Sequence, residues 1–167
     1  MQIIIDTREQ DMLSFRKECN PIRECLKVGD YSCRIDGNLI PVSFERKNVS
    51  DLFGTLSGGY DRFKKEINRS AELGIMLILA VECPLSEVRR GIKHSKRDPS
   101  SLIKQCFTLM VRHKVPCIFF SDRRDMAEYI TQVFFAFERE LNEKEKSSRK
   151  TKKDQSRATF PVDTQER

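Results

Sequence analysis

The alternation of hydrophobic and polar residues predicts several strands in the first 47 residues of the chain. Met1–Ile5 is a short apolar run, which favours a buried strand that delivers Asp6 to its end. Further strands are predicted at 22–26, 31–35 and 39–47. The sequence Asp36-Gly37-Asn38 has the composition of a hairpin turn before the last of them. These strands are expected to form a meander, with a turn or two of helix within residues 9–20.

After residue 47 the pattern changes to helices separated by apolar strands. Helices are predicted over about 48–57, 60–73, 85–91, 98–114 and from 121 onward. Residues 75–81 and 115–120 are apolar throughout, or nearly so, as is typical of strands buried on both faces. Such strands need helices on both sides. The order of elements therefore predicts one α/β domain with three α/β/α layers and a central mixed sheet.

The last helix carries a stripe of apolar residues at a spacing of three to four, which is expected to be core or a dimer seam: Met126, Ile130, Val133, Phe137 and Leu141, with Phe134 beside them. Beyond this stripe apolar residues nearly vanish, and 142–167 hold eight Lys and Arg against five Asp and Glu. We therefore predict a domain over 1–145 and a basic, disordered tail over 146–167.

Composition and charge narrow the partners. The 167 residues are 38% hydrophobic and 34% charged, with a formal net charge of +6, which favours a polyanionic partner such as nucleic acid. The chain has neither a membrane-length apolar run nor a signal-peptide pattern, so an intracellular protein without membrane contact, cytoplasmic or in the nucleoid or nucleus, is expected. Six cysteines lack paired short spacings and are interpreted as reduced thiols. His94 and His113 have no second ligand at metal spacing.

The candidate chemistry centres on the strand at 39–47. Side chains of a strand alternate between faces, so Glu45 and Lys47 share one face. A carboxylate and an amine so placed can serve one divalent ion and one water: the carboxylate holds the cation, and the amine orients or deprotonates the water. Glu-x-Lys alone is a weak signal, because such triplets also occur on solvated strands.

Two further motifs strengthen this signal. In chain order the motifs are Asp6-Thr7-Arg8-Glu9, then Gly29-Asp30, then Glu45-Arg46-Lys47 followed by Asp51. Asp30 followed by Glu45-x-Lys47 is the pattern of restriction-endonuclease-like nucleases. The full set closely resembles the nuclease domain of the XPF-type structure-specific endonucleases, motif by motif over about residues 3–75 and by element order over 75–140. An ordinary ion-pair network on a sheet is the alternative, but it explains one motif better than three.

The resemblance implies a restriction-endonuclease-like fold and a metal-dependent DNA endonuclease. The implied catalytic residues are Asp6, Glu9, Asp30, Glu45 and Lys47. Of these, Asp30 and Glu45, with the carbonyl of Arg46, would hold Mg²⁺ or Mn²⁺, and Lys47 would orient the attacking water. No small-molecule cofactor is expected.

Basic residues near these motifs are candidates for holding DNA phosphates. Near the site they are Arg8, Arg46, Arg62 and Lys65; in the basic segment 89–97 they are Arg90, Lys93, Lys96 and Arg97. The family commonly opens the helix at 60–73 with a Gly-Arg pair, and Tyr60 stands there in this chain, so Arg62 is expected to serve instead. The basic segment is either a clamp on a DNA backbone or a solvated loop.

The tandem helix-hairpin-helix module of longer XPF-type enzymes has no counterpart here, which indicates a stand-alone nuclease domain. The expected substrate is branched or structured DNA, such as a flap, fork or junction, in repair, recombination or a mobile element. Two alternatives remain: a catalytically silent module that only binds DNA or a partner nuclease, and a subunit active only with a DNA-binding partner. The resemblance also implies a homodimer.

Overall fold

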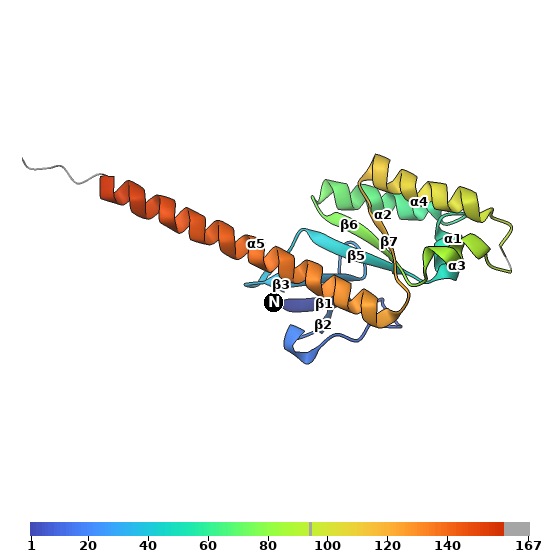
Figure 1. Ribbon diagram of the computed structural model, residues 1–167, viewed down its shortest axis with the longest axis horizontal. Coiled ribbons are helices and arrows are strands. Elements are labelled where there is room, and N and C mark those ends of the chain that lie inside the picture. Colours follow the sequence, from blue (N-terminus) through green and yellow to red (C-terminus); the bar gives the residue numbers. More distant parts are fainter. Residues whose placement is uncertain (94, 159–167) are drawn as a thin grey trace, which may run out of the picture.

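The computed structural model describes residues 1–93 and 95–158, and a seven-stranded mixed sheet lies at its centre (Figure 1). The strands are β1 (Gln2–Asp6), β2 (Ile22–Glu24), β3 (Tyr31–Ile35), β4 (Asn38–Leu39), β5 (Val42–Lys47), β6 (Met76–Val81) and β7 (Cys117–Phe119). The helices are α1 (Val49–Thr55), α2 (Tyr60–Glu72), α3 (Leu85–Arg90), α4 (Pro99–His113) and α5 (Arg123–Ala158), and Lys17–Cys19 forms a 3₁₀ turn. The α/β architecture predicted from the sequence is confirmed.

The strand order is β2-β1-β3-β5-β6-β7, with β4 paired to β3. β3 is antiparallel to β1 and β5, whereas β2 pairs with β1, β6 with β5 and β7 with β6 in parallel. The expected meander is therefore wrong, because β2 lies outside β1 and parallel to it. Residues 7–21 form a connection long enough to return the chain to the starting end of β1, which a parallel pair requires.

This topology gathers the motifs at one edge of the sheet. Since β3 is antiparallel to both β1 and β5, those two strands run in the same direction as each other and as β6 and β7. Asp6 ends β1, Lys47 ends β5, and Asp30 immediately precedes β3. The carboxyl ends of β1 and β5 and the start of β3 therefore meet at the same edge, although the residues are far apart in sequence.

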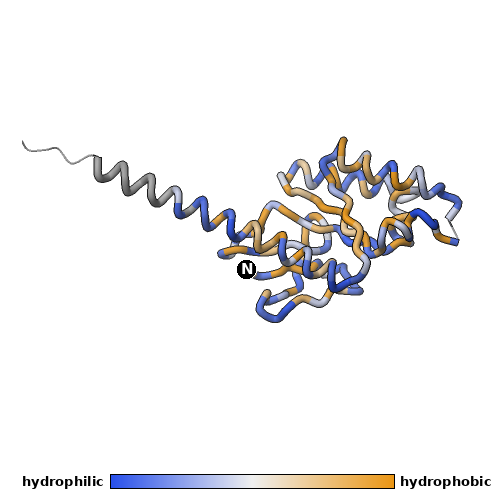
Figure 2. The backbone as a smooth tube through the Cα atoms, in the orientation of Figure 1, coloured by the Kyte–Doolittle hydropathy of each residue, from blue (hydrophilic) through white to orange (hydrophobic). Residues whose placement is uncertain are grey.

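Helices cover both faces of the sheet (Figure 1). On one face α5 packs Met126, Ile130 and Phe134 against strand residues such as Phe44, whose ring lies 5.7 Å from that of Phe134. On the other face α1, α2 and α4 pack against β6. The predicted stripe of α5 is thus core along this length, and Figure 2 shows hydrophobic positions where α5 crosses the sheet and mainly hydrophilic ones where it leaves it.

The helix α5 continues well beyond the sheet (Figure 1). Its helical backbone extends to Ala158, so residues 146–158 are helical where the sequence predicted a disordered tail, and 159–167 lie outside the described residues. The boundary of the domain at 145 stays a prediction. Within the described part of the chain, no helix is long and apolar enough to cross a membrane.

Candidate active site

The end of β5 places Glu45 and Lys47 on one face of the sheet, as the alternation predicted. Lys47 Nζ forms an ion pair with Glu45 Oε1, and the Glu45 residue is only 6% exposed. The two side chains line a cleft of about 450 Å³ whose opposite wall is formed by α1 and α2, including Arg62 and Glu66. Asn48 accepts the N–H of Asp51 at 2.9 Å and so caps α1 directly after the strand.

Asp30 reaches the same site from a tight turn. Gly29 has φ +71°, and a Cβ there would lie 2.4 Å from Ser43 Oγ and 2.8 Å from Phe44 O, so the turn is pressed against β5. The Asp30 N–H donates to Phe44 O at 2.7 Å, and Asp30 Oδ2 accepts the backbone N–H of Arg46 at 2.8 Å. The carboxylate of Asp30 is thereby held beside the strand that carries Glu45.

The two carboxyl groups interact electrostatically. Burial raises the pKa of Glu45 to about 8, the charge of Asp30 adds to this rise, and Lys47 opposes it. Burial likewise raises the pKa of Asp30 to about 6, against the hydrogen bond from Arg46 and the charge of Lys47. For Lys47, burial lowers the pKa, but the charge of Glu45, its hydrogen bond with Lys47 and the charge of Asp30 together outweigh burial, so the pKa is raised and the amine is protonated at neutral pH.

This donor set suits a hard divalent cation. Asp30 and Glu45 are oxygen ligands whose mutual repulsion a cation would relieve. Among the described residues, no group of three or more His, Cys, Asp or Glu side chains has the geometry to hold a metal ion. Mg²⁺ commonly binds through one or two carboxylates and keeps several waters or substrate phosphates, so the two carboxylates fit this pattern.

Asp6 differs from the other predicted catalytic acids, because its oxygens are already occupied. Its side chain is fully buried and accepts the backbone N–H of Arg8 at 2.8 Å, Arg8 Nε at 2.7 Å, Arg8 Nη2 at 3.0 Å and the N–H of Leu26 at 2.7 Å. Burial acts to raise the pKa of Asp6, but these hydrogen bonds outweigh it and the pKa is lowered. Asp6 therefore fastens the loop after β2 to the end of β1, and Arg8 is engaged in the same contact.

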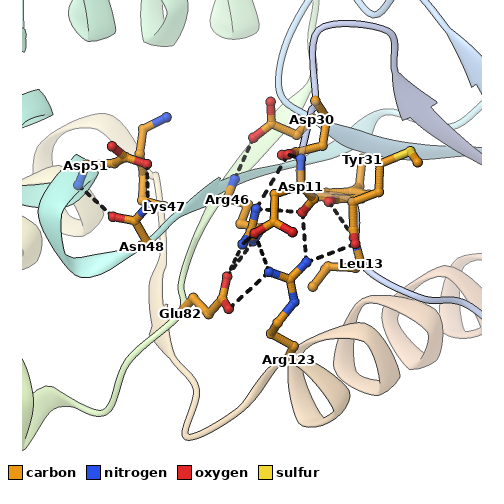
Figure 3. Close-up of polar contacts among 12 residues, drawn as sticks. Asp11, Leu13, Asp30, Tyr31, Arg46, Lys47, Asn48, Asp51, Glu82 and Arg123 are labelled. Carbon is orange, nitrogen blue, oxygen red and sulfur yellow. Dashed lines mark hydrogen bonds and ion pairs between the residues drawn. The ribbon is translucent and has the colours of Figure 1, made fainter.

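Arg46, between Glu45 and Lys47, points away from the cleft into an acidic network (Figure 3). Its guanidinium contacts Glu82, Asp11 at 3.1 Å and Glu9 at 3.5 Å, and its side chain is 9% exposed. Arg123, at the start of α5, joins Asp11 and lies 3.4 Å from Glu82. These five residues, Glu9, Asp11, Arg46, Glu82 and Arg123, are called the arginine network below. Arg46 is thus bound within the protein, and its expected phosphate contact stays a prediction.

Glu9 belongs to this network and also borders the edge of the sheet where the motifs gather. A second hollow of about 290 Å³ is lined by Glu9, Asp30 and Lys47, among others. This hollow shares Lys47 and Asp51 with the first cleft. The structure therefore brings together four of the five predicted catalytic residues around one edge, with Asp6 behind them as a buried anchor.

The predicted DNA-binding residues fall into separate places. Arg62 lines the cleft beside Glu45 and Lys47, whereas Lys65 is exposed on α2 and is not part of that lining. Arg90, Lys93 and Lys96 are exposed in and after α3, at the same end of the molecule as α1 in Figure 1. Arg97 is half-buried: its Nη2 donates to Gln105 Oε1 at 2.7 Å, and its Nε is buried without a partner among the described residues.

Several residues of the site were missed from the sequence. Glu66 lines the cleft from α2, and Glu82 and Arg123 complete the arginine network. A helical spacing signal existed for Glu66, which lies one turn after Arg62. For Glu82 the signal was its position directly after the buried strand β6, and for Arg123 its position at the start of α5. Both positions lie at the edge where the motifs gather.

Comparisons with known proteins agree with this fold. The chain resembles in fold "XPF from Aeropyrum pernix", with a TM-score of 0.62 and 22% identity over 81% of this chain and 66% of that one. It also resembles "XPF from Aeropyrum pernix, complex with DNA", with a TM-score of 0.59 and 21% identity over 81% and 64%. The chain thus spans about two thirds of the length of these relatives. No curated protein matches it significantly in sequence.

The family inferred from the three motifs is confirmed by a sequence profile. The ERCC4 domain profile matches residues 5–133, which include the end of β1, all of β2 to β7 and the start of α5. All the motif residues, from Asp6 to Asp51, lie inside the match. The chain therefore belongs to the ERCC4 domain family.

Proposed function

We propose that this protein is a divalent-metal-dependent endodeoxyribonuclease that hydrolyses phosphodiester bonds in branched or structured DNA. The observation that supports it most strongly is the position of Glu45 and Lys47 in one cleft with Arg62 on the opposite wall, and of Asp30 in an adjoining hollow that Lys47 also lines. Family membership supports the same reaction class. Repair, recombination and mobile-element movement are the processes that present such DNA.

Each side chain has a distinct task in this proposal. Asp30 and Glu45 hold Mg²⁺ or Mn²⁺, which when bound supplies a Lewis acid and acidifies a water. Lys47 is protonated, so it donates hydrogen bonds that orient the attacking water or stabilise negative charge on the phosphate, instead of acting as the base. Arg62 holds a phosphate near the scissile one.

DNA binding relies on positive charge outside the cleft. The net charge of +6 and the exposed Arg90, Lys93 and Lys96 favour backbone contacts at the catalytic end of the molecule. Such contacts displace counterions, so affinity should fall steeply with salt. The solved relative in complex with DNA is consistent with a DNA partner.

Self-association belongs to the proposal as well, but through a different surface from the one expected. The stripe of α5 is occupied by the core, whereas α4 exposes Phe107, Met110 and Val111 on one side. We therefore place the homodimer contact on α4. Light scattering at tens of micromolar should show a dimer that Phe107→Glu disrupts, with Leu141→Glu, an exposed apolar position on α5, as the matched control. A monomeric wild type would refute the dimer.

The decisive test is a cleavage assay with Mn²⁺ on flap, fork and Holliday-junction DNA, alongside Glu45→Gln. Cleavage by the wild type and none by the variant supports the proposal. DNA binding without cleavage favours the silent binding module, and cleavage only after a partner protein is added favours the dependent subunit. A wild type that neither binds nor cuts any of these substrates would overturn the proposal.

A further inference from the structure

The turn that carries Asp30 is also held from outside the sheet, by a contact to α2. Asp30 itself is fastened to β5 through Phe44 and Arg46. The N–H of the preceding Gly29, however, points to α2, where it donates to Glu66 Oε1 at 3.0 Å. Gly29 is buried, and a buried amide without an acceptor costs about 1–3 kcal/mol, so this contact fixes the direction of the turn.

Glu66 is well placed to act as a rigid support. It lies on α2 between Phe63 and Ile67, both 3% exposed in the core beneath that helix. The helix position is therefore set by packing against the sheet, and the side chain of Glu66 spans from the helix to the turn across the cleft. A shift of this acceptor would leave the Gly29 amide unpaired and would favour a rotation of the turn that displaces the Asp30 carboxylate, against the contacts to Phe44 and Arg46.

We propose that Glu66 is a positioning residue of the active site, which sets Asp30 against Glu45 through its hydrogen bond to the Gly29 amide. The inference rests on the proposed function, since its consequence is the affinity of the Asp30–Glu45 pair for a divalent cation. Glu66 acts through the turn and not as a ligand, consistent with the lack of a three-residue metal group in the described part of the chain. Loss of residues that support ligands typically lowers metal affinity or activity about 10–100-fold.

Two variants of similar length separate the hydrogen bond from the charge. Glu66→Gln removes the charge but keeps an oxygen that accepts the Gly29 N–H, whereas Glu66→Met removes the acceptor. Titration calorimetry of Mn²⁺ into DNA-free protein should give Glu66→Gln an affinity within a few-fold of wild type. Glu66→Met should bind Mn²⁺ at least about 10-fold more weakly than wild type. Glu72→Met, at an exposed glutamate of the same helix, is the matched control and should bind as wild type.

A second readout reports the turn itself. Hydrogen exchange of the Gly29 amide should be slow in wild type and Glu66→Gln and faster in Glu66→Met. With saturating DNA, kcat should fall in Glu66→Met and recover in Glu66→Gln, while the Kd for DNA without metal stays the same. Equal loss in both variants would mean that the charge matters, and wild-type affinity in Glu66→Met would mean that the contact does not; either result overturns the inference.

The failure of this inference is distinguishable from that of the proposed function. If the wild type binds Mn²⁺ and cuts DNA but Glu66→Met does so equally well, only the positioning assignment is lost. If the wild type binds no Mn²⁺ and cuts no DNA, the proposed function fails first. A thermal unfolding curve for each variant confirms that the measurements are made on folded protein.

Discussion

The two faces of β5 carry charge in opposite ways. On the cleft face, Glu45 and Lys47 form a pair beside a second acid, Asp30, and the pKa of each carboxyl group is raised. On the other face, Arg46 is surrounded by acids of the arginine network, and its side chain is 9% exposed. Adjacent residues of one strand therefore lie in different surroundings. On one face the positive charge does not balance the carboxyl groups, and on the other the ion pairs of the arginine network do.

This difference separates reactive from structural charge. Ionising two carboxyl groups that are close together in a buried site costs free energy unless a cation is bound. Raised pKa values of this kind cluster at functional sites. The arginine network instead joins the loop after β1, the end of β6 and the start of α5, with Arg123 donating to the carbonyls of Asp11 and Met12 at 2.8 and 2.9 Å. We expect substitutions on the cleft face to change chemistry, and those on the opposite face to change stability.

The largest effect is expected on the cleft face. Glu45→Gln removes a carboxylate charge of the proposed metal site and should abolish both Mn²⁺ binding and cleavage. Lys47→Ala leaves both acids in place, so Mn²⁺ binding should persist while cleavage falls about 10²–10³-fold, the typical cost of removing one positioned hydrogen-bond donor to developing charge. Calorimetry and a nicking assay measure the two quantities separately. Near wild-type cleavage by Lys47→Ala would show that this face of β5 is not catalytic.

On the opposite face, Arg46→Ala should act on folding. It removes the ion pairs of Arg46 with Glu9 and Glu82 and leaves Glu82 only its longer contact with Arg123, a loss that in a largely buried network costs about 3 kcal/mol of unfolding free energy. Since Asp30 accepts the backbone N–H of residue 46 and not its side chain, the Mn²⁺ affinity of the folded variant should stay near that of wild type. Urea denaturation and calorimetry test this. A variant with full stability but no metal binding would reverse the proposed division between the faces.

A pH dependence should be specific to the cleft face. Because the folded-state pKa values of Glu45 and Asp30 are raised to about 8 and about 6, the folded protein binds protons more tightly than the unfolded chain. Metal-free stability from these groups is therefore present at low pH and is lost as pH rises through about 4 to 8. Mn²⁺ would bind the deprotonated carboxyl groups, so its affinity should rise as the pH increases through the pKa values of about 6 and about 8.

Thermal unfolding between pH 5.5 and 8.5, with and without the metal, measures both trends. In Glu45→Gln the part of the slope due to Glu45 should disappear. In Arg46→Ala the slope should remain, since that substitution leaves both carboxyl groups in place. The assignment is contradicted if the metal-free stability of the wild type increases with pH over this range and this increase is absent in Glu45→Gln.

The smallest effect is expected outside both faces. Deletion of 146–167 removes seven Lys and Arg against three Asp and Glu, so DNA affinity should fall and its salt dependence should become shallower. Cleavage at low salt and saturating DNA should be unchanged, because the deleted segment begins far along α5 from the catalytic edge (Figure 1). Loss of turnover on saturating DNA would give the segment a part in catalysis.

The sequence alone determined the elements and the core of the site, for local physical reasons. Alternation along 42–47 fixed which side of β5 carries Glu45 and Lys47, and the apolar runs at 75–81 and 115–120 marked the strands β6 and β7. Gly29 marked the tight turn before β3, where its positive φ and close approach to Ser43 leave no room for a side chain. The alternation of a strand and the positive φ of a glycine turn depend on neighbours in the chain, whereas the approach of Gly29 to Ser43 depends on packing.

Only the tertiary structure decided which charged residues are available for chemistry. Asp6 and Arg46 stand in the motifs beside Asp30 and Lys47, yet hydrogen bonds from Leu26 and Arg8 occupy the first, and Glu82 and Asp11 hold the second. Glu66 joins the site only because α2 packs over the turn at Gly29. The partner of a charged side chain depends on strand order and helix packing. Local pattern does not specify strand order, as the parallel placement of β2 beside β1 shows.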